Sequence, residues 1–338
     1  GGQDACINQL LAEMDGFVES RDGHVFVVAA TNFPQKVDPA LTRSGRLDLH
    51  MEVPVLDKPA RKHFLDKLQI VAPNLERATL DNLASLTAGM SGADLEKLVR
   101  EAELLIFRRP EVDLTSADLL ELLNVIKHGA RLTASSPLLK EQLEATAYHE
   151  AGHAIASLIL NPHVRVQQVT IVPRGEALGF TAYDPDSLQR HSFNRKEIMD
   201  LICVALAGRI AESKRFPGPT AMADHNVTMG GADSGASSDL RRATDLAWQA
   251  ITQWGLDDEF GWMSMGAVEN PPELWETKAA HLVEQWLREA ETATKQLLQE
   301  HWQKVRELAV ALLAQEVLFE EDLNKFRPPN ASESSGGK

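Results

Sequence analysis

The sequence has little of several features that would place it in large classes of protein. Its two cysteines, Cys6 and Cys203, are far apart in unrelated contexts, which excludes a disulfide framework and predicts buried thiols in a reducing compartment. No run approaches the roughly 18 apolar residues that a membrane span needs, and no signal peptide is present. The formal net charge of −15 disfavours nucleic-acid binding and electrostatic docking on an anionic membrane.

The remaining composition is that of a soluble globular protein. Hydrophobic residues make up 43% and charged residues 25% of the 338 residues, which suits two or three domains with cores of their own. The chain opens with Gly-Gly and not with Met, so we expect it to be an excised part of a longer protein, with room upstream for a targeting or anchoring segment. The sequence contains neither a G-x-x-x-x-G-K-[ST] phosphate loop nor an apolar strand that ends in Asp-Glu.

A metal-binding pattern lies near the middle of the chain. His149-Glu150-Ala151-Gly152-His153 falls in a stretch, 142–160, that is typical of one helix. Residues four apart share a helix face, so one ion can reach both imidazoles, and Glu150 can reach a water on that ion. This is the H-E-x-x-H pattern of zinc peptidases, with histidines as ligands and glutamate as general base. The alternative is a chance match on a long helix.

A catalytic zinc usually has three protein ligands and one open position for water, so a third ligand must come from elsewhere. The candidates are acids and one histidine in the second half of the chain: Glu176, Glu212, Asp224, His225, Asp233 and Asp239. Asp239 starts a helix after a Gly-rich loop that could bring it close to another helix. Position alone does not choose among the candidates, and helix capping or solvent exposure is the ordinary role of a single acid.

Periodicity predicts mostly helices, with strands at two places. Helical spacing of apolar residues covers 5–17, 61–70, 80–86, 91–107, 115–128, 142–160, 194–216 and 237–254, and two long helices that run to about 315. Apolar β-branched runs predict strands at 25–30, buried on both faces, and at 51–55. A further pair, 164–172 and 180–183, predicts a hairpin, and 131–137 is predicted to be a linker.

Several ordered motifs resemble those of FtsH-type AAA+ zinc metalloproteases over nearly the whole chain. They are Gln9–Phe17, Ala30-Thr31-Asn32, Asp38–Arg46, Ser91–Leu95, Thr146–Ala154, Ile171–Gly175, Ala177–Gly179 and Ser234–Leu240. The resemblance implies an α/β AAA+ remnant, the end of a parallel sheet, at 1–57 and a helical lid at 58–131. It also implies a mainly α zinc metallopeptidase domain with a small β element at 132–326, and a disordered tail at 327–338.

The resemblance assigns the peptidase chemistry. Zn2+ would be held by His149, His153 and Asp239, since the family's third ligand lies in the segment that matches Ser234–Leu240. Glu150 would be the general base in peptide-bond hydrolysis. The loop before Asp239 looks longer than the family's usual one, which leaves Asp224, His225 and Asp233 as rival ligands. The strand near Ile171–Val172 would present an edge to extended substrate; an ordinary hairpin is the alternative.

The resemblance also assigns a nucleotide site for ATP with Mg2+. Asn32 would be sensor 1, and Arg43 and Arg46 would be arginine fingers that complete the site of a neighbouring subunit, which implies a homo-hexamer. The other interpretation of the two arginines is solvated loop cations. Gly92 and Ala93 would line the nucleotide through their backbones, or they are ordinary residues of a helix start.

The chain departs from the family in ways that limit these expectations. It lacks the Walker A loop, the Walker B acids, the aromatic pore loop and the membrane helices, so we expect it to begin just after Walker B and not to hydrolyse ATP alone. Phe33, Ser44 and Leu47 stand where the family usually has Arg, Pro and Phe, which weakens the finger assignment.

The resemblance implies a parent protein in protein quality control. That parent would be membrane-anchored, with this part soluble on the cytoplasmic, matrix or stromal side, and would unfold and degrade membrane and misfolded soluble proteins without binding nucleic acid. Two rivals are a non-proteolytic AAA+ chaperone or assembly module and an unfoldase with a vacant metal site.

Overall fold

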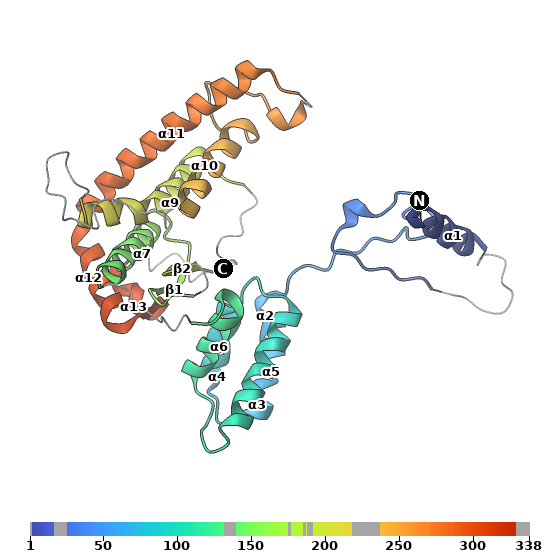
Figure 1. Cartoon of the computed structure of the whole chain (residues 1–338), viewed down its shortest axis with the longest axis horizontal. Helices are drawn as coiled ribbons and strands as arrows, with labels where there is room; N and C mark the ends of the chain where they lie inside the picture. Colours follow the sequence, from blue (N-terminus) through green and yellow to red (C-terminus); the bar gives the residue numbers. More distant parts are fainter. Residues whose placement is uncertain are drawn as a thin grey trace. The chain divides into compact units, whose positions relative to one another are not determined.

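The computed structural model describes residues 2–16, 26–131, 140–174, 177–184, 187, 192–217, 237–268 and 270–328 (Figure 1). The chain forms two compact units, Gly1–Val55 and Leu56–Lys338. No helix among the described residues is long and apolar enough to cross a membrane. The predicted linker and the predicted disordered tail fall mostly at 132–139 and 329–338, outside the described residues.

The described residues of the first unit form a helix but no sheet. Helix α1, Gly2–Gly16, confirms the predicted N-terminal helix, and a 3-10 turn, Pro34–Lys36, lies further along the chain. The strands predicted at 25–30 and 51–55 are wrong: 26–30 and 51–55 have no regular structure. Their apolar side chains are exposed, among them Phe26 at 91% and Val53 at 87%. A strand needs neighbouring backbones for its hydrogen bonds, and the described residues of this unit offer none to these segments.

The second unit begins with a helical bundle, as predicted. Its helices are α2 (Lys58–Leu65), α3 (Leu68–Val71), α4 (Arg77–Leu86), α5 (Gly92–Arg108) and α6 (Ser116–His128). The single helix predicted over 61–70 is two helices. Reciprocal capping boxes start α5 and α6, because Ser91 and Thr115 exchange hydrogen bonds with the acids three residues on. Leucines from all five helices form the core of this bundle.

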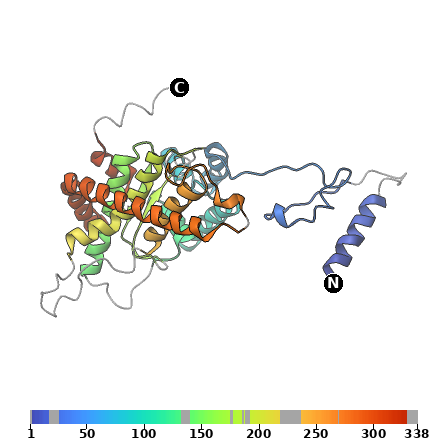
Figure 2. The same ribbon diagram turned by 90° about the horizontal axis from the view of Figure 1, so that it is seen from above.

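The larger part of the second unit is mainly helical. Its helices are α7 (Lys140–Leu160), α9 (Arg195–Arg215), α10 (Ser237–Thr252), α11 (Glu273–Glu300), α12 (Trp302–Gln315) and α13 (Glu320–Leu323), with 3-10 turns at Met265–Ala267 and Asn324–Phe326. Helix α11, the long orange helix in Figure 2, packs on α9 and α10. Helices α7, α9 and α10 confirm the helices predicted at 142–160, 194–216 and 237–254.

A small antiparallel sheet completes this part. The predicted hairpin is present as β1 (Val166–Thr170) and β2 (Phe180–Tyr183), with Thr170 opposite Phe180. A third strand, β3 (Val317–Phe319), was not predicted, and the strand order is β2-β1-β3. Only three residues long, β3 gives too little alternation to recognise from sequence. Among the described strands it puts β1 in the centre and leaves β2 at an edge.

Helices α7 and α9 cross at very short range, and this contact places the site described below. Both helices present alanines to the shared core, and a Cβ added to Gly152 of α7 would lie 2.5 Å from the carbonyl oxygen of Ala207. Only a glycine fits there, so the backbones approach closely enough for side chains of α7 to touch α9.

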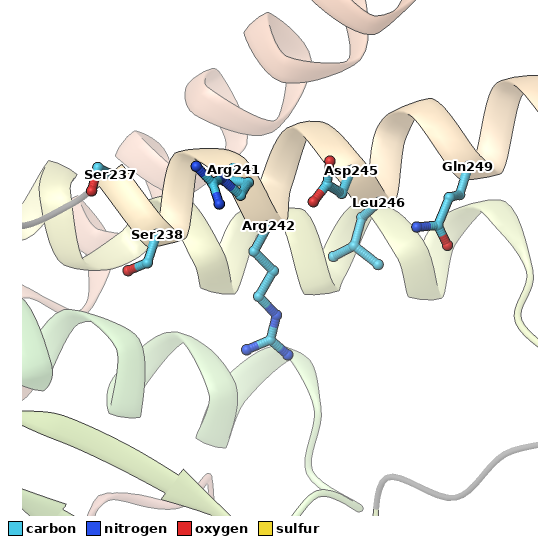
Figure 3. Close-up of a pocket in the computed structure, with 7 residues that line it drawn as sticks. All are labelled: Ser237, Ser238, Arg241, Arg242, Asp245, Leu246 and Gln249. Atoms are coloured by element: carbon cyan, nitrogen blue, oxygen red, sulfur yellow. The ribbon is translucent and has the colours of Figure 1, made fainter. Parts of the chain in front are cut away.

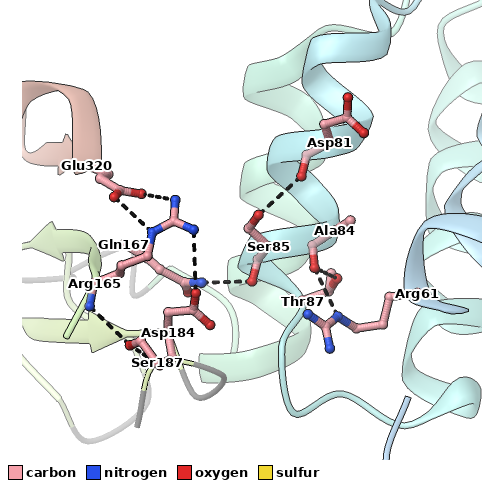
Figure 4. A network of polar contacts seen from close by, with 10 residues as sticks. All are labelled: Arg61, Asp81, Ala84, Ser85, Thr87, Arg165, Gln167, Asp184, Ser187 and Glu320. Atoms are coloured by element: carbon pink, nitrogen blue, oxygen red, sulfur yellow. Dashed lines mark hydrogen bonds and ion pairs between the residues drawn. The ribbon is translucent and has the colours of Figure 1, made fainter. Parts of the chain in front are cut away.

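Polar contacts join the helical bundle to the sheet (Figure 4). Gln167 of β1 donates a hydrogen bond of 2.7 Å to the carbonyl oxygen of Ser85 at the end of α4, and both groups are buried. Beside it, Arg165 pairs with Glu320 at 2.7 Å and with Asp184 at 3.8 Å. A buried backbone oxygen would be costly without a partner, so Gln167 ties the bundle to the sheet at this point.

Candidate metal centre

Helix α7 presents the two predicted histidines on one face. The Nε2 atoms of His149 and His153 lie 3.1 Å apart, and the rings meet edge to face with centroids 4.8 Å apart. Their side chains are 14% and 10% exposed, so both are largely withdrawn from solvent. The four-residue spacing on a regular helix produces this pair without any distortion.

Asp239, in the first turn of α10, comes to the same point. Its Oδ2 lies 3.1 Å from Nε2 of His149 and 3.1 Å from Nε2 of His153. Among the described residues these three form a group able to hold a metal ion, with all ligand atoms within 4.8 Å of one another. The rivals Glu176, Asp224, His225 and Asp233 lie outside the described residues.

The outer ring nitrogens are also held, both by α9. Nδ1 of His149 lies 3.2 Å from Oε2 of Glu212, and Nδ1 of His153 lies 2.8 Å from the carbonyl oxygen of Val204. Such partners fix each ring's orientation and tautomer and leave Nε2 for a metal. Glu212, one of the predicted candidates for third ligand, therefore contacts the far side of the His149 ring. Its position on the inward face of α9 is the signal from which this contact could have been expected.

Space for the centre depends on Gly208 of α9, which the sequence did not single out. A Cβ at this position would lie 2.3 Å from Nε2 of His153 and 2.7 Å from Nε2 of His149. Any side chain here would occupy the place where the two ligand nitrogens converge. A glycine in the interior of an apolar helix is the only sequence signal for such a role.

Glu150 is buried on the side of the sheet. Its side chain accepts a hydrogen bond of 2.8 Å at Oε2 from the Thr181 hydroxyl of β2. Burial raises the pKa of Glu150, and the charges of His153 and His149 partly oppose that rise. A carboxyl group with a raised pKa is suited to accept and return a proton near neutral pH.

The histidines and Asp239 stabilise one another's charged forms. Burial favours the neutral form of His149, but hydrogen bonds to Asp239 and Glu212 outweigh it and raise the pKa of His149 to about 10. Burial would likewise raise the pKa of Asp239, yet hydrogen bonds to His149 and His153 bring it well below its usual range. The centre offers two imidazole nitrogens and one carboxylate oxygen, a donor set that Zn2+ prefers. The outer nitrogens of the histidines have partners, and Gly208 leaves room at the centre.

The predicted nucleotide residues are spread over both units. Asn32 and Arg43 are exposed in the first unit. Arg46 is engaged within that unit, because it forms two hydrogen bonds to Asp15 of α1, at 2.9 and 2.7 Å, and one to the carbonyl oxygen of Ala40. Gly92 and Ala93 occupy the first turn of α5 in the second unit.

The fold and the centre together define a class of protein: a metallohydrolase whose metal centre sits on an H-E-x-x-H helix. The chain belongs to peptidase family M41, whose family model matches residues 137–326. The model for the ATPase family associated with various cellular activities matches residues 1–55, and the AAA+ lid domain model matches 78–119. The resemblance to FtsH-type AAA+ zinc metalloproteases is thereby confirmed.

Similar proteins carry a consistent name. A Syntrophus aciditrophicus protein called "ATP-dependent zinc metalloprotease FtsH" is 35% identical over 352 residues, covering 99% of this chain and 45% of the relative. Proteins of the same name from Nitrosococcus oceani and Thermus thermophilus are 36% and 38% identical, each covering 94% of this chain and 50% and 48% of the relative. The chain thus spans about half the length of the curated relatives it matches.

Proposed function

We propose that this chain carries the zinc endopeptidase site of an ATP-dependent protease, with His149, His153 and Asp239 as ligands and Glu150 as general base. One observation carries the proposal: three ligand atoms from α7 and α10 converge, with the outer nitrogens of both histidines held by α9. Bound zinc would supply Lewis-acid activation of the scissile carbonyl and of a water molecule.

Glu150 moves the proton in this proposal. Thr181 occupies Oε2 of Glu150, so Oε1 is left to take a proton from the attacking water and to return it to the leaving amine. Because burial raises the pKa of Glu150, the carboxyl group holds the transferred proton more readily than an exposed glutamate would. Glu212 and the Val204 carbonyl keep both imidazoles turned toward the centre throughout.

We further propose that extended substrate adds to β2. The edge predicted near Ile171–Val172 is wrong for β1, because β1 pairs with β2 on one side and with β3 on the other. Among the described residues β2 pairs with β1 alone, and its Thr181 contacts the proposed base. A peptide hydrogen-bonded along β2 would therefore pass close to Glu150.

In the whole protein we propose coupling to ATP. Asn32, Arg43 and Arg46 would act at nucleotide sites of a homo-hexamer, with Gly92 and Ala93 near the bound nucleotide. Arg43 is the more available finger, since Arg46 is engaged by Asp15. We propose domains at 1–57, 58–131 and 132–326. We also propose that the whole protein has a membrane anchor outside this chain. Its proposed substrates are membrane proteins and misfolded soluble proteins.

Replacing the proposed base tests the peptidase assignment. Glu150→Gln should retain stoichiometric zinc and lose cleavage of unfolded casein, whereas Glu144→Gln, the same change at a half-buried position of α7 that pairs with Arg215, should keep both. Cleavage by Glu150→Gln at the parental rate would overturn the mechanism. Stoichiometric zinc without any peptidase activity in the parent would favour the non-proteolytic chaperone or assembly module instead.

A further inference from the structure

We propose that a groove along α10, next to the metal centre, is a substrate subsite in which Arg242 binds a carboxylate of the polypeptide. The inference rests on the proposed peptidase function and adds a preference for acidic substrate.

The groove lies along α10, the helix whose first turn carries Asp239. It has a volume of about 470 Å³ and is lined by side chains of α10 between Ser237 and Gln249, among them the apolar Leu246 (Figure 3). Sites for small ligands usually measure about 300–1,000 Å³, so the groove has room for a side chain and adjoining backbone. Asp239 belongs to the same first turn of α10, so a chain lying in the groove is within a helical turn of a metal ligand.

Arg242 is available to a ligand. Among the residues that the structure describes, neither Arg241 nor Arg242 has a hydrogen bond or an ion pair, although Asp245 lies three or four residues further on. Figure 3 shows the Arg242 side chain extended away from α10, in a different direction from Arg241. A guanidinium group presents a planar fork of donors that matches both oxygens of a carboxylate.

The charge of Arg242 acts on the same region as the proposed catalytic carboxylates. Burial raises the pKa of the Tyr183 hydroxyl on β2, the charge of Arg242 opposes that rise, and Glu150 and Asp239 add to it. The cation Arg242 and the carboxylates Glu150 and Asp239 therefore all act on Tyr183, within a chain of net charge −15. A substrate acid would be repelled by Glu150 and attracted by Arg242, so it should lie a residue or more away from the scissile bond.

Peptide binding to the zinc-loaded Glu150→Gln chain tests this subsite without requiring turnover. A neutral fluorescent peptide would carry one Asp at successive positions, with Asn as the isostere, and each version would be made with a free and an amidated C-terminus. We expect Asp at one position, or the free terminus, to bind about fivefold tighter than its neutral counterpart, as a partly exposed charge-assisted pair allows. These arms distinguish an internal acid from a chain end.

Variants identify the residue responsible. In the same background, Arg242→Gln should remove the preference, Arg242→Lys should keep part of it, and Arg242→Glu should turn it toward Lys-containing peptides. Asp245→Asn should strengthen it, since a competing carboxylate is removed. Arg306→Gln, an exposed arginine of α12, should leave it unchanged.

Equal binding of Asp and Asn peptides at every position, together with equal binding of free and amidated C-termini, would overturn the subsite, as would a preference that survives Arg242→Gln. Failure of the parent chain to cleave any peptide would count against the proposed function alone. The binding preference would then still stand or fall by its own measurement.

Discussion

Adding one methyl group at Gly208 should abolish tight zinc binding while leaving the fold in place. A Cβ there would lie 2.3 Å from Nε2 of His153, whereas ordinary contact begins at 3.4 Å, so the imidazole must move by about 1.1 Å. Metal–ligand distances tolerate only about 0.2 Å. Loss of partners that merely orient a ligand already costs about 10- to 100-fold in affinity, so we expect at least about 100-fold for Gly208→Ala.

The fold should survive this change for a separate reason. Overpacking costs about 1–3 kcal/mol, and replacing glycine by alanine inside a helix returns up to about 1 kcal/mol. Zinc affinity would be measured by competition with a chromophoric chelator, and metal-free stability by urea unfolding. Gly92→Ala is the matched control, because its Cβ would meet nothing nearer than Phe64 at 3.6 Å. A folded Gly208→Ala chain that binds zinc as tightly as the parent would refute the reasoning.

Three further predictions follow from contacts around the centre. Glu212→Gln should lower zinc affinity by about 10- to 100-fold without unfolding the chain, measured by the same competition, because His149 loses its anionic partner at Nδ1. Thr181→Val should keep zinc and lower kcat for a peptide substrate, because Glu150 loses its bond at Oε2; an unchanged kcat would contradict this. Burial lowers the pKa of His128, whose ring lies 4.0 Å from that of Phe180, with the charges of Lys127 and Arg174 adding to the effect. Below pH 6.5 the unfolded chain therefore binds a proton that the folded chain resists, so the contribution of His128 to urea stability should fall from pH 7.5 to 5.5, measured as the difference between the parent and His128→Phe.

The helices of the second unit were predictable because each carries its own signal. The capping boxes at Ser91 and Thr115 and the apolar spacing along α7 are local, so the sequence alone fixes where these helices begin. The strands predicted in the first unit failed for the opposite reason. The run 26–30 has strand composition, but a parallel strand exists only as part of a sheet, and no ladder partner for it lies among the described residues.

The residues of the site likewise divide into those with a local sequence signal and those that depend on long-range contacts. The spacing of His149 and His153 is local and could be predicted without a fold. Asp239 needed the family resemblance, since nothing in the sequence measures its distance from α7. Gly208 and the Thr181 contact could not have been found, because both depend on how closely α9 and β2 approach α7.

These long-range contacts explain why the small sheet belongs to the chemistry. β1 is held in the centre by β3 and fixed to the helical bundle by Gln167, so β2 has a defined edge beside α7. The same edge supplies Thr181 to the proposed base, and its first residue, Phe180, packs with a tilted ring against His128 at the end of α6. A displacement of α6 would therefore move Phe180. The next residue of β2 is Thr181, which is hydrogen-bonded to Glu150. In the proposed ATP-driven protease, the helical bundle and the proposed base Glu150 would then be only two contacts apart.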